Sequence, residues 1–178
     1  MKINNTYILE PLEQKIVELT AKARQHNKEV TGVNGKGTAA NDDKHLYRNI
    51  IGFGAEFVFC KHYNIHCDYS IGNTSKKKGT DKYDAVINGF SIDVKVTEKK
   101  LPLMTPEYSK SDVDGFAFFH CNYPKYEFKG FATNEQLFKE TNLKQIKVNS
   151  YVLDTKFLLS DSEFLFLTKL NKLKNDNE

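Results

Sequence analysis

The chain has 178 residues, of which 39% are hydrophobic and 28% are charged, and its formal net charge is +3. This length and balance suit a single soluble domain with a sizeable core and exclude a disordered or fibrous chain. No apolar run is long enough to span a membrane, and the first residues lack the apolar stretch of a signal peptide. Cys60, Cys67 and Cys121 have no metal-type spacing, so we expect buried thiols in a reducing cytoplasm.

Two helices are expected in the first third of the chain, over residues 11–26 and 43–63. Their apolar stripes recur at helical spacing: Leu12, Ile16, Leu19 and Ala23 in the first, and Leu46, Ile50, Phe53 and Phe57 in the second. The first is typical of a packing helix that begins at Pro11. Residues 65–71 alternate like an extended segment, and residues 72–80 form a polar loop.

Glu56 is the unusual residue of the second helix. Phe53, Phe57 and Phe59 flank it, and nearby glycines would allow another element to approach closely. A carboxylate in such a contact costs free energy unless it is paired or bound to a metal. We therefore favour a functional role for Glu56 over that of a solvated helix glutamate.

Residues 81–97 predict a β-hairpin. Asn88-Gly89 between alternating apolar residues favours a two-residue turn, because both positions of a type I′ turn need positive φ. The turn fixes the register, so that Ile87 faces Phe90 and Asp84 faces Asp93. Strand alternation then sorts the side chains. One face is apolar (Tyr83, Ala85, Ile87, Phe90, Ile92, Val94, Val96), and the other holds Lys82, Asp84, Val86, Ser91, Asp93 and Lys95.

The polar face of this hairpin places two carboxylates opposite each other. With Cβ atoms about 5 Å apart, Asp84 and Asp93 repel by about 3 kcal/mol at an effective dielectric constant near 20. Folding does not need such a pair, whereas a divalent cation does, because hard cations bind carboxylate oxygens. Lys95 follows on the same face and can reach a phosphate held there.

Asp84 followed by Asp93-Val94-Lys95 on an apolar strand resembles the PD-(D/E)XK nuclease superfamily, over about residues 46–133. The chain has six D/E-x-K tripeptides, but only the one at Asp93 has a carboxylate eight to ten residues upstream across a predicted hairpin. Tyr83, rather than proline, precedes Asp84. The resemblance implies a single domain with a restriction-endonuclease-like α/β/α core, in which helices flank a mixed sheet, over about residues 43–159.

The resemblance also implies chemistry and partners. It assigns Mg²⁺, with Mn²⁺ as a substitute, to Asp84, Asp93, the main-chain carbonyl of Val94 and Glu56, and it assigns Lys95 to the attacking water or the phosphate. The expected substrate is DNA. Lysines flank the hairpin and are balanced between contact with the DNA backbone and a solvated loop: Lys76, Lys77, Lys78, Lys99 and Lys100.

The remaining residues predict further elements of an α/β fold. Residues 98–113 look irregular because of Pro102 and Pro106, and strands follow over 114–122, 126–133 and 151–159. A capping box opens a short helix over 133–140, and a final helix covers 160–170. Its apolar residues fit either the core or a homodimer face. Asp154-Thr155-Lys156 is interpreted as surface charge on the last strand.

The sequence therefore predicts a Mg²⁺-dependent nuclease, foremost a DNA endonuclease. Two alternatives stay open. One is a catalytically inactive nucleic-acid-binding or regulatory protein with the same fold. The other is an α/β protein in which the carboxylate pair arose by chance. Binding of a divalent metal separates the last alternative from the other two, and DNA cleavage separates the first alternative from the nuclease.

Overall fold

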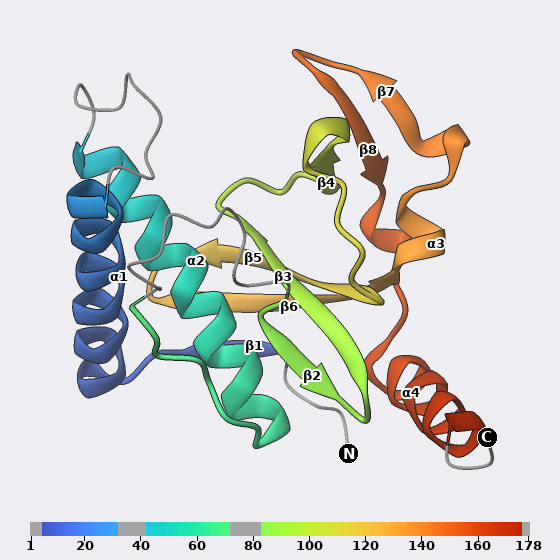
Figure 1. Cartoon of the computed structure of the whole chain (residues 1–178), viewed down its shortest axis with the longest axis horizontal. Coiled ribbons are helices and arrows are strands. Elements are labelled where there is room, and N and C mark those ends of the chain that lie inside the picture. Colours follow the sequence, from blue (N-terminus) through green and yellow to red (C-terminus); the bar gives the residue numbers. More distant parts are fainter. Residues whose placement is uncertain (1–4, 32–41, 72–82, 176–178) are drawn as a thin grey trace.

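The computed structural model describes residues 5–31, 42–71 and 83–175, which form an α/β fold with a curled five-stranded sheet (Figure 1). The elements are β1 (Thr6–Ile8), α1 (Pro11–Thr31), α2 (Asp42–Tyr63), β2 (Ala85–Ile87), β3 (Phe90–Thr97), β4 (Leu103–Pro106), β5 (Gly115–Asn122), β6 (Lys125–Thr133), α3 (Asn134–Leu137), β7 (Leu143–Gln145), β8 (Asn149–Leu153) and α4 (Asp161–Asn175). Single 3-10 turns lie at Glu107–Ser109, Glu140–Asn142 and Thr155–Phe157.

The main sheet is mixed. Its strand order is β1-β6-β5-β3-β2, in which β3 runs parallel to β5 and the other neighbours are antiparallel. Asp114 fixes the start of the parallel pair, because its carboxylate accepts hydrogen bonds from the backbone N–H and the hydroxyl of Ser91. A second sheet, of order β4-β8-β7, lies apart from the first. The mixed sheet flanked by helices is the expected architecture at this coarse level.

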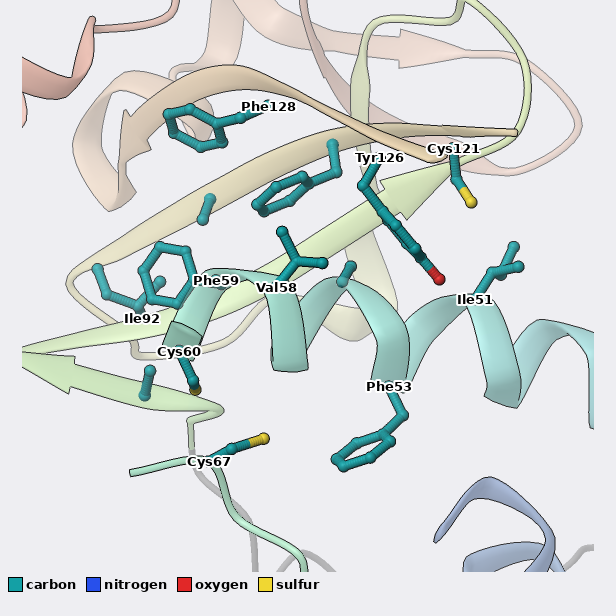
Figure 2. Packing of buried hydrophobic residues seen from close by; sticks show 14 of the residues in the cluster. Ile51, Phe53, Val58, Phe59, Cys60, Cys67, Ile92, Cys121, Tyr126 and Phe128 are labelled. Atoms are coloured by element: carbon teal, nitrogen blue, oxygen red, sulfur yellow. The ribbon is translucent and has the colours of Figure 1, made fainter. Parts of the chain in front are cut away.

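Alternation along β5 divides the interior into two cores. Ala117, Phe119 and Cys121 belong to the larger core with α2, whereas Phe116 and Phe118 face the small sheet. Figure 2 shows α2 lying across the sheet in the larger core, with Val58 and Phe59 directed toward it. Complete burial of a side chain such as Phe59 contributes about 2–3 kcal/mol. These contacts fix the position of α2, and with it the position of Glu56.

The predicted register of the hairpin is confirmed for the three pairs next to the turn, and the predicted pair of Asp84 with Asp93 is not part of the ladder. Ile87 pairs with Phe90, Val86 with Ser91 and Ala85 with Ile92. Asn88 and Gly89 have φ values of 51° and 80°, the positive values that a type I′ turn needs. The turn is also anchored from outside, since the Asn88 amide donates to the hydroxyl of Thr168 in α4 at 3.0 Å.

Several element boundaries were predicted wrongly. The helices α1 and α4 extend beyond the predicted ends at residues 26 and 170, because neither stretch contains the glycine or proline that would stop a helix there. The predicted capping box at Thr133 and Gln136 is present, but α3 ends at Leu137. Tyr83 is 50% exposed rather than part of the core face, because it precedes the first residue of β2 and strand alternation does not apply to it.

The small sheet accounts for the other errors. Residues 98–113 contain β4, a strand bounded by the two prolines that suggested irregular structure, and β7 was not predicted. The last strand covers Asn149–Leu153 rather than 151–159. It stops because the Asp154 side chain accepts a hydrogen bond from the Lys156 N–H and caps a 3-10 turn. Among the described residues, no helix has the length and apolar character needed to cross a bilayer.

Candidate active site

Asp84 lies at the point where the backbone of β2 leaves β3. Its N–H donates to the carbonyl of Ile92 at 2.8 Å, and its Oδ2 accepts the N–H of Val94 at 2.6 Å. Because β2 begins at Ala85, no strand carbonyl among the described residues pairs with the Val94 N–H on this side, and the Asp84 carboxylate accepts its hydrogen bond instead. The N–H and C=O of one strand residue point to the same side, so the Val94 carbonyl is directed to this edge as well.

Asp93 and Lys95 project from one face of β3. Lys95 Nζ lies 2.6 Å from Asp93 Oδ2, in an ion pair between residues two apart on the strand. The side chains keep 20% and 37% of their exposure, respectively, so solvent and solutes can reach this pair. Asp93 is therefore partly neutralised by a partly exposed cation.

Glu56 reaches the same region from α2, and Arg24 of α1 holds it. Arg24 Nη1 donates to Glu56 Oε2 at 3.0 Å, while its other nitrogens donate to the carbonyls of Asp68 and Ser70. The guanidinium also lies 4.5 Å from the centroid of the Phe53 ring. This fork joins both helices to residues 68–70. A planar group with five donors can do this, whereas a lysine ammonium cannot.

Arg24 is the site residue that sequence reasoning missed. Two signals pointed to it: Glu56 was expected to need a cation or a metal, and the chain has only two arginines, Arg24 and Arg48. The spacing of 32 residues between Arg24 and Glu56 hid the pair, because it depends on how α1 packs against α2.

The site carries more negative than positive charge. Burial, together with the charges of Glu56 and Asp93, raises the pKa of Asp84 to about 8, although the hydrogen bond from the Val94 N–H acts in the opposite direction. The pKa of Glu56 is also raised, since burial outweighs the effect of Arg24. Three carboxylates face two cations, Arg24 and Lys95. The missing positive charge can be supplied by a proton on Asp84 or by a bound cation.

The oxygen donors at this edge fit a hard divalent cation. Asp84 has one carboxylate oxygen left beside the one that accepts from Val94, Asp93 is close by, and the Val94 carbonyl shares the edge. Carboxylate and carbonyl oxygens are the ligands that Mg²⁺ prefers, together with water and phosphate oxygens. In the part of the chain that the structure describes, no three Asp, Glu, His or Cys side chains cluster around one point. The Val94 carbonyl, water or phosphate would thus complete the coordination.

The predicted DNA-binding lysines fall in different places. Lys99 and Lys100 are exposed just beyond the end of β3. Lys100 lines a cavity of about 360 Å³ that it shares with His120, Lys129 and residues of the turn after β8. Lys76, Lys77 and Lys78 lie outside the described residues.

The structure therefore brings Asp84, Asp93 and Lys95 together on one hairpin, with Glu56 close enough to influence the pKa of Asp84. Comparisons of the chain with protein-family models, with curated proteins and with solved structures found no match.

Proposed function

We propose that this chain is a metal-dependent nuclease of the PD-(D/E)XK superfamily, with a restriction-endonuclease-like fold, that hydrolyses phosphodiester bonds in DNA. The observation that carries the proposal is the close approach of Asp84 and Asp93 across the β2–β3 hairpin, with Lys95 paired to Asp93. Two carboxylates that share a partly buried edge are costly for the fold and useful for a cation.

Each residue of the site would have a separate role in hydrolysis. A bound divalent cation would stabilise negative charge on the phosphate and lower the pKa of a water molecule. Asp84, Asp93 and the Val94 carbonyl would hold it, and Asp84 would lose its proton on binding. Glu56 would add negative charge near Asp84 while it keeps its ion pair with Arg24.

Lys95 has the role closest to the substrate. In the structure it neutralises Asp93 at 2.6 Å. A divalent cation held by Asp93 would weaken the attraction between these two side chains, and the Lys95 ammonium would then be available to a phosphoryl oxygen or to the attacking water. The Lys95 side chain is 37% exposed, so a substrate in solvent can reach it. In that position the Lys95 ammonium would stabilise the negative charge that develops on the phosphate in the transition state.

The fold supports the proposal and also differs from the expected α/β/α core. A helix bearing Glu56, a hairpin bearing the two aspartates and a strand parallel to β3 follow one another along the chain. Residues 98–114, all of which the structure describes, contain β4 and a 3-10 turn rather than a helix. The small sheet and α3 cover the face opposite α2. The proposal treats this covering as a variation on the common core.

A DNA-binding protein without catalysis is the second candidate, and one observation favours it. Each of the acidic candidates has an internal partner: Glu56 pairs with Arg24, Asp93 with Lys95, and Asp84 with the Val94 N–H. An inactive descendant could keep these pairs for folding alone. The two candidates differ in what happens when DNA and Mg²⁺ are supplied together.

The test is cleavage of DNA by single-residue variants. Linear, circular, single-stranded and branched DNA are incubated with Mg²⁺ and wild type, Asp93→Ala or Lys95→Ala. We expect wild type to cleave at least one substrate, Asp93→Ala to be inactive, and Lys95→Ala to lose two or more orders of magnitude. Calorimetry should show that Lys95→Ala still binds Mg²⁺.

Lys129→Ala is the matched control. Lys129 is also a strand lysine paired with a carboxylate two residues away, since its Nζ lies 2.8 Å from Glu127 Oε1. It is on β6, away from the two aspartates, and its loss should leave cleavage at saturating DNA within a few fold of wild type. Equal activity of all variants, or wild type that binds DNA without cutting it, would refute the nuclease proposal.

A further inference from the structure

The end of α2 and the segment after it bring two cysteines together. Cys60 and Cys67 are 2% and 6% exposed. In Figure 2 the Cys60 side chain extends from α2 toward Cys67, and a hydrogen bond between the two thiols lowers the pKa of Cys60 and raises that of Cys67. The third cysteine, Cys121, lies elsewhere in the core beside Tyr126 (Figure 2). Two of the three thiols are therefore neighbours, and the third is separate.

The way in which α2 ends explains this meeting. Asn64 adopts a left-handed conformation with φ of 51°, and the Ile65 N–H donates to the Cys60 carbonyl at 3.0 Å. This pattern is the Schellman closure of a helix, in which the chain reverses after its last turn. The reversal returns Cys67 to the side of Cys60.

We propose that Cys60 and Cys67 are a redox modification site that forms a reversible intrachain disulfide. The oxidant is a low-molecular-weight disulfide. One cysteine thiolate attacks it, forms a mixed disulfide and releases one small thiol. The second cysteine then attacks the mixed disulfide and releases the second small thiol. The protein loses two hydrogens and two electrons and gains one S–S bond, while the small disulfide is reduced to two thiols.

The oxidant reaches the buried thiols when residues 64–71 open. These residues belong to no helix or strand. Side chains of α1 hold them through main-chain carbonyls: Arg24 binds those of Asp68 and Ser70, and the Asn27 amide binds that of Ile71 at 2.8 Å. A segment held in this way can open without unpairing a sheet.

The disulfide would link the two segments that Arg24 binds, which are α2 at Glu56 and the segment after it at Asp68. Glu56, which pairs with Arg24, lies one helical turn before Cys60, and Asp68, whose carbonyl accepts from Arg24, follows Cys67. Oxidation therefore fixes the distance between the two groups that Arg24 bridges. The inference does not rest on the proposed nuclease activity, because a change in mass reports it.

The experiment uses the full chain and oxidised glutathione. The native protein is incubated with the reagent, quenched in acid and weighed intact, and a sample in urea confirms that the reagent is active. We expect wild type to lose about 2 Da, which corresponds to two hydrogens. Trypsin cuts after Lys61, so the disulfide should link peptide 49–61 to peptide 62–76. Excess dithiothreitol should separate the two peptides.

The variants distinguish this pair from other thiol chemistry. Cys121→Ser should still lose about 2 Da, whereas Cys67→Ser should instead retain a glutathione adduct or react with nothing. The oxidised wild type should melt about 5 °C higher than the reduced form, because the crosslink restricts the unfolded chain. The proposal is overturned if the native wild type keeps both thiols free for alkylation, if it stops at a glutathione adduct, or if the linkage involves Cys121.

Discussion

Replacement of Asp84 by asparagine should remove a loss of stability that wild type suffers as the pH rises. Burial and the neighbouring charges of Glu56 and Asp93 raise the pKa of Asp84 from 3.8 to about 8. Between these values the folded protein keeps a proton that the unfolded chain releases. The stabilising effect of this proton is therefore complete below pH 3.8 and is lost progressively as the pH approaches 8.

The size of the effect follows from proton linkage. Each pH unit within this window removes about 1.4 kcal/mol from the free energy of unfolding, so that the fall from pH 5 to pH 7 reaches at most about 3 kcal/mol. Asparagine resembles the protonated acid: its oxygen can accept the Val94 N–H, which Asp84 Oδ2 accepts at 2.6 Å, and its NH₂ can donate to Asp93. The advantage of Asp84→Asn over wild type should therefore grow by about 2–3 kcal/mol between pH 5 and pH 7, from about 1.5 to about 4 kcal/mol.

The measurement is urea denaturation of both proteins at pH 5, 6 and 7 without metal. Asp112→Asn is the control, because Asp112 is an exposed aspartate away from this edge, and its variant should follow the wild-type pH dependence. Parallel curves for wild type and Asp84→Asn would refute the reasoning. They would show that Asp84 is ionised in the folded protein without added metal.

Three further results are expected. Mg²⁺ at pH 7 should raise the melting temperature of wild type more than that of Asp84→Asn, because only an ionised Asp84 gains from the cation. Arg24→Ala should lower the free energy of unfolding, measured by urea denaturation, by about 3 kcal/mol. Adding Glu56→Gln to this variant should restore part of the loss, since a neutral amide needs no cation. If nothing is restored, Glu56 is not the main partner of Arg24. In α2, Gly54→Ala should destabilise the protein by about 1–3 kcal/mol, because the added Cβ would overlap the Tyr126 hydroxyl. Gly52→Ala should stabilise it by up to about 1 kcal/mol, because a Cβ there meets no atom within 4 Å. Similar effects at both glycines would contradict this packing.

The β2–β3 hairpin could be predicted from the sequence because the residues that determine it are adjacent in the chain. Asn88-Gly89 favours one turn geometry, and that turn fixes the three pairs from Ile87–Phe90 to Ala85–Ile92, after which Asp84 leaves the ladder. The capping box of α3 is local in the same sense, since Thr133 and Gln136 satisfy each other. In both cases a few adjacent residues decide the local backbone geometry, which is why these two elements could be predicted.

The small sheet could not be read because its strands are defined by distant partners. In β4, Leu103–Pro106 pairs with residues near position 150, and the three residues of β7 become a strand only beside β8. The two prolines near β4 read as breakers from the sequence, yet proline is compatible with the end of an edge strand. Strand assignment there depends on the approach of another segment, which hydrophobic alternation over four residues does not encode.

Arg24 and Glu56 show a third situation, in which the sequence poses a question that only the packing answers. The apolar neighbours of Glu56 implied that its charge must be compensated, by a metal or by a cation. The structure supplies Arg24 as an ion-pair partner for Glu56, and it is Asp84, which has no cationic partner among its contacts with the described residues, whose pKa rises to about 8. If a cation binds here, its gain in free energy comes mainly from Asp84 and Asp93. Glu56 then tunes the site from a fixed position, and replacing it should change metal affinity less than replacing either aspartate.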